Sequence, residues 1–136
     1  MFKFPLFQNI DSLPQLVLWL LNIYSRLSGG NLVKFIVVDI GDWDMDATAS
    51  VTVDYKQAVG DTDFKRVLGV SVQIFNDAMT DSYFTSDVDD GMTSVKVDST
   101  TTKVTLTRKG SGFFDGTDYD STSIDTRGKI TLCLST

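Results

Sequence analysis

The apolar periodicity of this chain changes at Gly29-Gly30, from the spacing of a helix to the alternation of strands. Before the two glycines, apolar side chains recur every three or four residues, whereas after them apolar and polar residues alternate in several short runs. These two periods are not interchangeable, because a helix face repeats every 3.6 residues and a strand face every second residue. The chain is therefore expected to be α+β and mainly β, with residues 1–30 as an N-terminal unit and residues 31–136 as a second domain.

Start and stop signals predict one helix over residues 13–28. Ser12 and Gln15 fit a capping box, and Pro14 falls in the first turn, where its missing N–H is not needed. The glycines at 29–30 supply the left-handed conformation that ends many helices. Such a helix would be about 24 Å long and only marginally stable alone in water, so it is expected to pack against another surface.

The predicted helix carries apolar side chains at a 4-3-4-3 spacing, which is the seam of a coiled coil. The seam residues are Leu13, Val17, Leu20, Tyr24 and Leu27. Self-association through this seam is expected, because the apolar surface is wider than one small domain would normally cover. Since Tyr24 is bulky for the core of a dimer, a homotrimer is favoured. The alternative is a helix that lies on its own β-domain.

After Asn31 the sequence predicts an antiparallel β-sandwich. Alternating apolar runs indicate strands at residues 33–38, 51–55, 67–75, 94–97, 103–107 and 129–134. Turn residues separate these runs, and six or seven short strands with regular turns are typical of a sandwich. The first strand is expected to be buried on both faces near its end. The single cysteine, Cys133, is expected to act as a small core hydrophobe in the last strand.

Residues 1–11 carry more large apolar side chains than a free tail would: Phe2, Phe4, Leu6, Phe7 and Ile10. The first three alternate, so an extended segment could present them along one face. The segment is expected to be an anchor that docks into an apolar groove of another protein, by strand addition or side-chain insertion. The alternative is that it folds back over the β-domain of its own or a neighbouring copy.

Composition argues against several functions. The chain has no histidine, and this removes the commonest general base and the commonest metal ligand. No Gly-x-Ser-x-Gly or Ser-x-x-Lys motif and no phosphate-binding loop is present. We therefore expect no enzyme, no catalytic residue and no cofactor. The net charge of -6 and the scattered basic residues argue against nucleic acid. The longest apolar run, residues 16–21, is too short to span a bilayer, so no membrane is expected as a partner.

Two acidic runs invite comparison with calcium sites. Residues 42–46 alternate aspartates as an EF-hand loop does, but Ala47 and Val53 stand where that loop needs Gly and Glu. Residues 87–91 form a second acidic loop. No metal site is assigned, because a simpler interpretation accounts for the first run. In that interpretation the aspartates face water, and the residues that alternate with them point inward: Trp43, Met45 and Ala47.

Aromatic residues leave open a glycan-binding function. Seven could stack on sugar rings: Trp43, Tyr55, Tyr83, Phe84, Phe113, Phe114 and Tyr119. The alternative is that a sandwich of this size uses several of them in its core. Since the adjacent pairs 83–84 and 113–114 place their members on opposite faces, one residue of each pair is expected to be partly exposed.

Several segments together resemble a family of short virion-associated proteins in phages of Bacteroidota, including the crAss-like phages. They are residues 27–33, 38–46, 50–51, 76–77, 112–122 and 127–128, of which Ile40-Gly41-Asp42-Trp43-Asp44-Met45-Asp46 is the most specific. The resemblance covers about residues 27–136. It implies a structural subunit of a head or tail fibre, made in the host cytoplasm and located in the virion, with capsid or tail proteins as partners.

The predicted sandwich also looks like that of trimeric H-type lectins, at the level of the fold only, and no sugar-binding residue is transferred. The sequence thus favours a trimeric, non-enzymatic virion fibre subunit attached through its N-terminal segment. The alternative is a carbohydrate-binding module of such a fibre, which recognises a host surface glycan.

Overall fold

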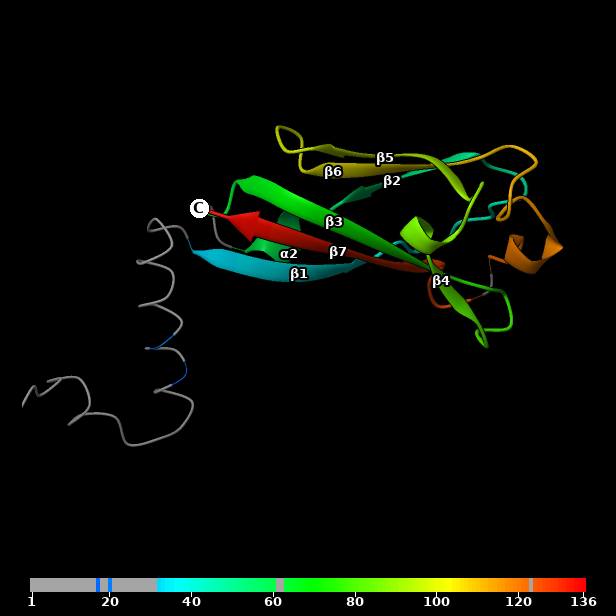
Figure 1. Cartoon of the computed structure of the whole chain (residues 1–136), viewed down its shortest axis with the longest axis horizontal. Coiled ribbons are helices and arrows are strands. Elements are labelled where there is room, and N and C mark those ends of the chain that lie inside the picture. The colour runs from blue at the N-terminus through cyan, green and yellow to red at the C-terminus, as the bar shows by residue number, and fades with distance from the viewer. Residues whose placement is uncertain (1–16, 18–19, 21–31, 61–62, 123) are drawn as a thin grey trace, which may run out of the picture.

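The computed structural model describes residues 17, 20, 32–60, 63–122 and 124–136. Two antiparallel sheets pack face to face as a sandwich-like fold (Figure 1). The larger sheet has the strand order β1 (Val33–Asp39), β7 (Gly128–Ser135), β3 (Arg66–Phe75) and β4 (Ser82–Phe84). The smaller sheet has the order β2 (Ser50–Asp54), β6 (Lys103–Arg108) and β5 (Met92–Asp98). The fold is thus mainly β, as predicted.

Short helical turns occupy three of the connections between strands: α2 (Lys56–Val59), η2 (Thr85–Asp87) and η3 (Thr117–Tyr119). Helix α2 follows β2 directly and buries Val59. It ends at Gly60, whose φ of 64° lies in the left-handed region that favours glycine.

The core lies between the inner faces of the two sheets. Strand β7 shows the reason most clearly, because it pairs with β1 on one side and β3 on the other and has no free edge. Its alternate residues Ile130, Leu132 and Leu134 are completely buried. Val104 and Leu106 of β6 are buried from the opposite sheet. Each such side chain contributes about 1.5–3 kcal/mol to folding, so this alternation is what fixes the register of the sandwich.

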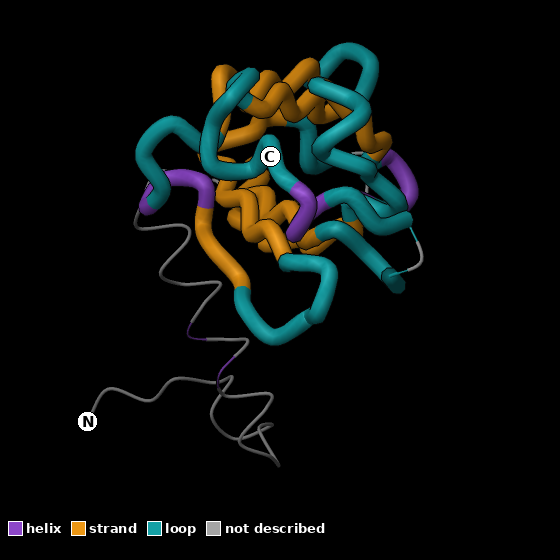
Figure 2. The backbone as a smooth tube through the Cα atoms, turned by 90° about the vertical axis from the view of Figure 1, so that its right-hand side faces the viewer, coloured by secondary structure: helices purple, strands orange, loops and turns teal. Residues whose placement is uncertain are grey.

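The two ends of the sandwich differ. At one end, here called the terminal end, β1 begins where β7 finishes, and the Leu32 N–H donates to Thr136 Oγ1 over 3.3 Å. The opposite end, here called the loop end, gathers the connections 40–49, 76–81 and 109–127, which lie on the right in Figure 1 and face the viewer in Figure 2. These connections contact one another through main-chain hydrogen bonds, including one from the Met45 N–H to the Tyr119 carbonyl at 2.9 Å.

All six predicted strands are confirmed, each within two residues at either end. The sequence did not predict β4 or α2, which have three and four residues and are too short for a periodic signal. The predicted helix and coiled coil fall on residues 13–28, which lie outside the described residues except for Val17 and Leu20. The division of the chain at residues 30 and 31 stays a prediction.

Two predictions about burial are wrong. Strand β1 is buried on one face only, since Ile36 points into the core whereas Phe35 is 70% exposed. The reason is that no other described element covers the outer face of the larger sheet. Cys133 lies on the same outer face, opposite Phe35, and is partly exposed instead of belonging to the core.

Candidate functional site

The loop end is built around a buried arginine. Arg127 is completely buried just before β7, and its Nε donates to the Trp43 carbonyl at 2.9 Å. Its terminal nitrogens donate to the carbonyls of Phe75 at 2.8 Å and Ser121 at 2.7 Å, and to Asp77 Oδ1 at 2.7 Å. One side chain thereby joins three connections that are far apart in sequence. Four protein acceptors occupy its donors, so this cation holds the loops together and is not presented to a ligand.

A second buried arginine links two of the same connections. Arg108, at the end of β6, donates from Nε to the Met45 carbonyl and from Nη2 to the Asp46 carbonyl at 2.8 Å. Its Nη2 also lies 3.1 Å from Asp115 Oδ1, so that the guanidinium forms an ion pair with the 109–127 connection. Arg108 and Arg127 therefore fix the backbone of the loop end from inside the molecule.

The carboxylates beside Arg127 have shifted pKa values. Burial alone would raise the pKa of Asp77, but hydrogen bonds from Arg127 and from the Ser121 backbone N–H outweigh it and lower the pKa below its ordinary value. The neighbouring Asp120 shares a hydrogen bond with Asp77, and this bond, together with desolvation and charge repulsion, raises the pKa of Asp120. Both shifts follow from the positions of the two carboxylates in the loop scaffold.

An aromatic shelf, formed by Tyr83 and Phe113, is exposed at the loop end. The two rings lie edge to face, with centroids 5.0 Å apart. Phe113 also packs edge to face on Phe114, which is completely buried. The absence of a side chain at Gly91 leaves room for the Phe114 ring, because a Cβ there would lie 2.8 Å from it. The shelf is thus a rigid apolar surface with support from the core.

Of the seven aromatic residues considered for sugar stacking, four are core residues: Trp43, Tyr55, Phe114 and Tyr119. The expectation for the pair 113–114 is confirmed, with Phe113 exposed and Phe114 buried. In the pair 83–84 both residues are exposed, because β4 is a three-residue edge strand with little to cover either face.

The acidic runs do not assemble a metal site in the part of the chain that the structure describes. No group of three or more acidic or cysteine side chains there is close enough to hold a metal ion. Trp43 and Met45 are buried as predicted, but Ala47 is exposed. The chain turns at this point, and Asp44 Oδ1 accepts the Ala47 N–H at 2.9 Å. In the second run, Asp90 forms an ion pair with Lys109.

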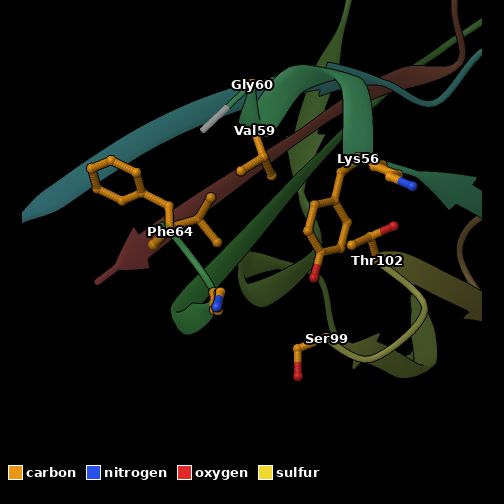
Figure 3. A pocket seen from close by; sticks show the side chains of 9 residues that line it. Lys56, Val59, Gly60, Phe64, Ser99 and Thr102 are labelled. Atoms are coloured by element: carbon orange, nitrogen blue, oxygen red, sulfur yellow. The ribbon is translucent and has the colours of Figure 1, made fainter. Parts of the chain in front are cut away.

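A cavity of about 420 Å³ lies beside α2, at the terminal end (Figure 3). Val59 and Phe64 line one part of it, whereas the hydroxyl groups of Ser99 and Thr102 lie at another. The Lys34 ammonium group lies over the ring of Phe64, 5.5 Å from its centroid. The described residues that line the cavity include no carboxylate and no thiol, so they offer apolar contacts, hydroxyls and the amines of Lys56 and Lys65.

The outer face of the larger sheet is apolar along β1. Val33, Phe35 and Val37 alternate with inward-pointing residues and are 50%, 70% and 57% exposed. The sequence predicts the alternation in this strand, but it also predicts burial of both faces near the end of the strand, from which the exposed outer face differs. Exposed apolar side chains in a row are typical of a contact surface, whereas single exposed ones need no explanation.

The structure describes only two of the predicted seam and anchor residues, Val17 and Leu20. Val17 and Leu20 of the seam are 46% and 51% exposed, so they are not covered by the described part of the same chain. The other seam residues, Leu13, Tyr24 and Leu27, lie outside the described residues, as do the anchor residues Phe2, Phe4, Leu6, Phe7 and Ile10. Both assignments stay predictions.

No family model, no curated protein and no solved structure matches this chain. In the described ranges, no helix combines the length and the apolar character that crossing a bilayer requires. The assignment of a function therefore rests on the residues themselves.

Proposed function

We propose that the protein is a structural subunit of a phage virion, a trimeric head or tail fibre subunit attached through its N-terminal segment. The observation that carries this proposal is the exposure of apolar side chains on the predicted seam and on the strand that follows it. Val17, Leu20 and Phe35 are all about half exposed or more in the single chain. Such surfaces promote aggregation of a free monomer, whereas in an assembly they are buried in the contacts between subunits.

The chemistry of the described residues supports a structural function. The two buried guanidinium groups are occupied by protein acceptors, and the described lining of the cavity beside α2 has no carboxylate and no thiol. The protein contains no histidine that could act as a base. Stable loops on a sandwich are instead what a passive subunit of a particle requires.

The expected assembly is a homotrimer through residues 13–28, with residues 31–136 as the β-domain of each copy. The resemblance of residues 27–136 to virion-associated proteins of Bacteroidota phages supports a place in a head or tail fibre. Residues 1–11 are then the anchor that joins the trimer to another capsid or tail protein. An apolar, alternating segment suits docking by strand addition or side-chain insertion.

Deleting residues 2–10 is expected to leave a folded, trimeric and more soluble protein that no longer enters virions. The reason is that the deletion removes every apolar side chain of the anchor while it spares the seam. The measurement is immunogold electron microscopy of particles from phages that carry the deletion. A matched variant, with Lys3, Gln8 and Asn9 replaced by alanine, keeps the apolar residues and should be incorporated normally. Normal incorporation of the deletion variant would place the anchor elsewhere.

The second candidate is a carbohydrate-binding module, which the aromatic shelf favours. Tyr83 and Phe113 offer exposed rings on a rigid base at the loop end, and the predicted likeness to H-type lectins agrees with such a function. This candidate predicts binding of one sugar class on a glycan array with a Kd below about 1 mM. Tyr83→Ala should weaken that binding several-fold, whereas Phe84→Ala, outside the shelf, should not. If the wild-type protein binds no glycan in this range, the result rejects the carbohydrate-binding candidate and favours the purely structural function.

A further inference from the structure

We infer that the outer face of strands β1, β7 and β3 is a second contact surface between copies of this chain, continuing the association of the N-terminal unit into the β-domain. The inference rests on the proposed trimer and adds to it the surface through which the sandwiches contact one another.

One half of this surface is a ridge, formed by Val33, Phe35 and Val37 on β1. The three side chains point to the same side of the sheet, because alternate residues of a strand share a face. All are at least half exposed in the single chain. Since β1 is an edge strand, the ridge stands at the margin of the sheet.

The other half is a trough, formed by small residues next to the ridge. Phe35 is paired with Cys133, which is paired in turn with Gly69 on β3. Each such row of paired residues across the sheet is here called a rung. On the next rung of the same face, Val37 is paired with Thr131, and Thr131 is paired with Ser71. Nothing lies within 4 Å of the position that a Cβ at Gly69 would take, so the space above the trough is open.

Ridge and trough lie side by side on one face, so a ridge cannot fill the trough of its own chain. It can fill the trough of a second copy that is rotated about an axis beside β1. This contact is heterologous, because each copy offers its ridge to one neighbour and its trough to the other. Heterologous contacts that close on themselves form rings, and a trimer is the smallest ring in which each copy has two different neighbours.

The position of β1 in the chain brings these surfaces together. It is the first strand after the N-terminal unit and begins at Val33. Copies that are joined through residues 13–28 therefore hold their β1 strands near the common axis. A stable interface buries about 800 Å² of each partner, more than three half-exposed side chains supply. The face is accordingly an extension of the contact through the seam and not a replacement for it.

Charge also favours a second copy of this chain as the occupant. The chain carries a net charge of -6, so copies repel each other wherever acidic surfaces meet. The rungs of Phe35 and Val37 contain no charged residue on the outer face. On the next rung, Asp39 is neutralised by Lys129, with Asp39 Oδ1 and Lys129 Nζ 2.6 Å apart. Arg66 of β3 lies on the rung of Val33, so this face also carries a cation, and two copies can approach on it without repulsion between acidic side chains.

The test compares Phe35→Thr with Phe84→Thr in the full-length chain. Both substitutions remove an exposed phenylalanine from an edge strand of the larger sheet and keep a residue that favours strands. Light scattering over a dilution series should show that Phe35→Thr dissociates at a protein concentration at least about tenfold higher than wild type, as loss of a central aromatic contact predicts. Phe84→Thr, on β4 at the opposite edge, should dissociate as wild type does.

Cys133 reports on the same surface, because it is the only cysteine and lies in the trough. Its reaction with a maleimide should be about tenfold slower in the wild-type trimer than after dissociation by dilution, since the reagent must reach the thiolate. Equal rates in both states, with a trimer that Phe35→Thr leaves intact, would overturn the inference and spare the proposed trimer. Protection that persists in the dissociated chain would overturn it in favour of coverage by residues 1–31 of the same copy. A wild-type protein that is monomeric throughout would overturn the proposed trimer itself.

Discussion

Replacing Asp77 by alanine is expected to lower the free energy of unfolding by about 3–5 kcal/mol. Arg127, the partner of Asp77, is completely buried and would keep its charge without a counter-ion. The destabilisation should extend over the whole loop end, because the same guanidinium donates hydrogen bonds to the carbonyls of Trp43, Phe75 and Ser121. Urea denaturation followed by tryptophan fluorescence measures the effect, with all variants at one protein concentration since association contributes to apparent stability.

Asp39→Ala is the matched control for this experiment. It breaks the ion pair with Lys129, whose two side chains are largely exposed, and such pairs contribute about 0–1 kcal/mol. If Asp77→Ala destabilised the protein no more than Asp39→Ala does, the buried ion pair would not be what holds the loop end.

The ion pair also determines how acid acts on the fold. The pKa of Asp77 is lowered in the folded state, so the unfolded chain binds a proton more readily. The stabilisation by this group is therefore complete above the ordinary pKa of an aspartate and is lost as the pH falls through the lowered value. The raised pKa of Asp120 acts in the opposite sense, but that carboxylate depends on Asp77 for its shift and is exposed. The difference in stability between wild type and Asp77→Ala should accordingly shrink as the pH is lowered below the ordinary aspartate range.

Leu20→Asp is expected to convert the proposed trimer into monomers. A buried seam leucine contributes about 1.5–3 kcal/mol, and its loss from three copies removes about 5–9 kcal/mol from the assembly. The introduced carboxylates would, in addition, face each other in the seam. Leu20 is 51% exposed in the single chain, so the substitution should leave each β-domain folded. Light scattering gives the mass, and circular dichroism checks that the β signal is retained.

Met79→Asp is the control for Leu20→Asp, because Met79 is an apolar residue with almost the same exposure, 48%, on the β-domain. It lies in the 76–81 connection at the loop end, away from both the predicted seam and the proposed contact face of β1, β7 and β3. A trimeric mass for both variants would show that residues 13–28 are not the element of assembly.

Strand positions were predictable because the apolar period of two is a local signal. Residues 103–107 and 129–134 show this best, since both strands have a face that is completely buried and therefore alternate clearly. Which strands form which sheet is a non-local property, and the pairing of β1 with β7 joins residues about a hundred positions apart. The exposure of Phe35 could not be predicted for the same reason, because it depends on which face of the assembled sheet another layer covers.

The burial of Arg108 and Arg127 could not be predicted from the sequence either. Arg127 was visible only as part of a turn, because its four acceptors come from three other segments. A side chain that is charged, next to a glycine and between two polar stretches is normally exposed. Only the approach of residues 43, 75, 77 and 121 creates the polar cage that makes its burial favourable.

The hydrogen bonds of Arg127 and Arg108 have a consequence for how freely the loop end can vary. Five of the groups that these arginines hold are main-chain carbonyls, those of Trp43, Met45, Asp46, Phe75 and Ser121. Every amino acid supplies the same carbonyl, so mutations in the connections can change side chains without removing the acceptors that define the loop conformation. The end of the sandwich farthest from both Leu32 and Thr136 can thus diversify in sequence on a constant backbone, as variable loops do on other β-scaffolds.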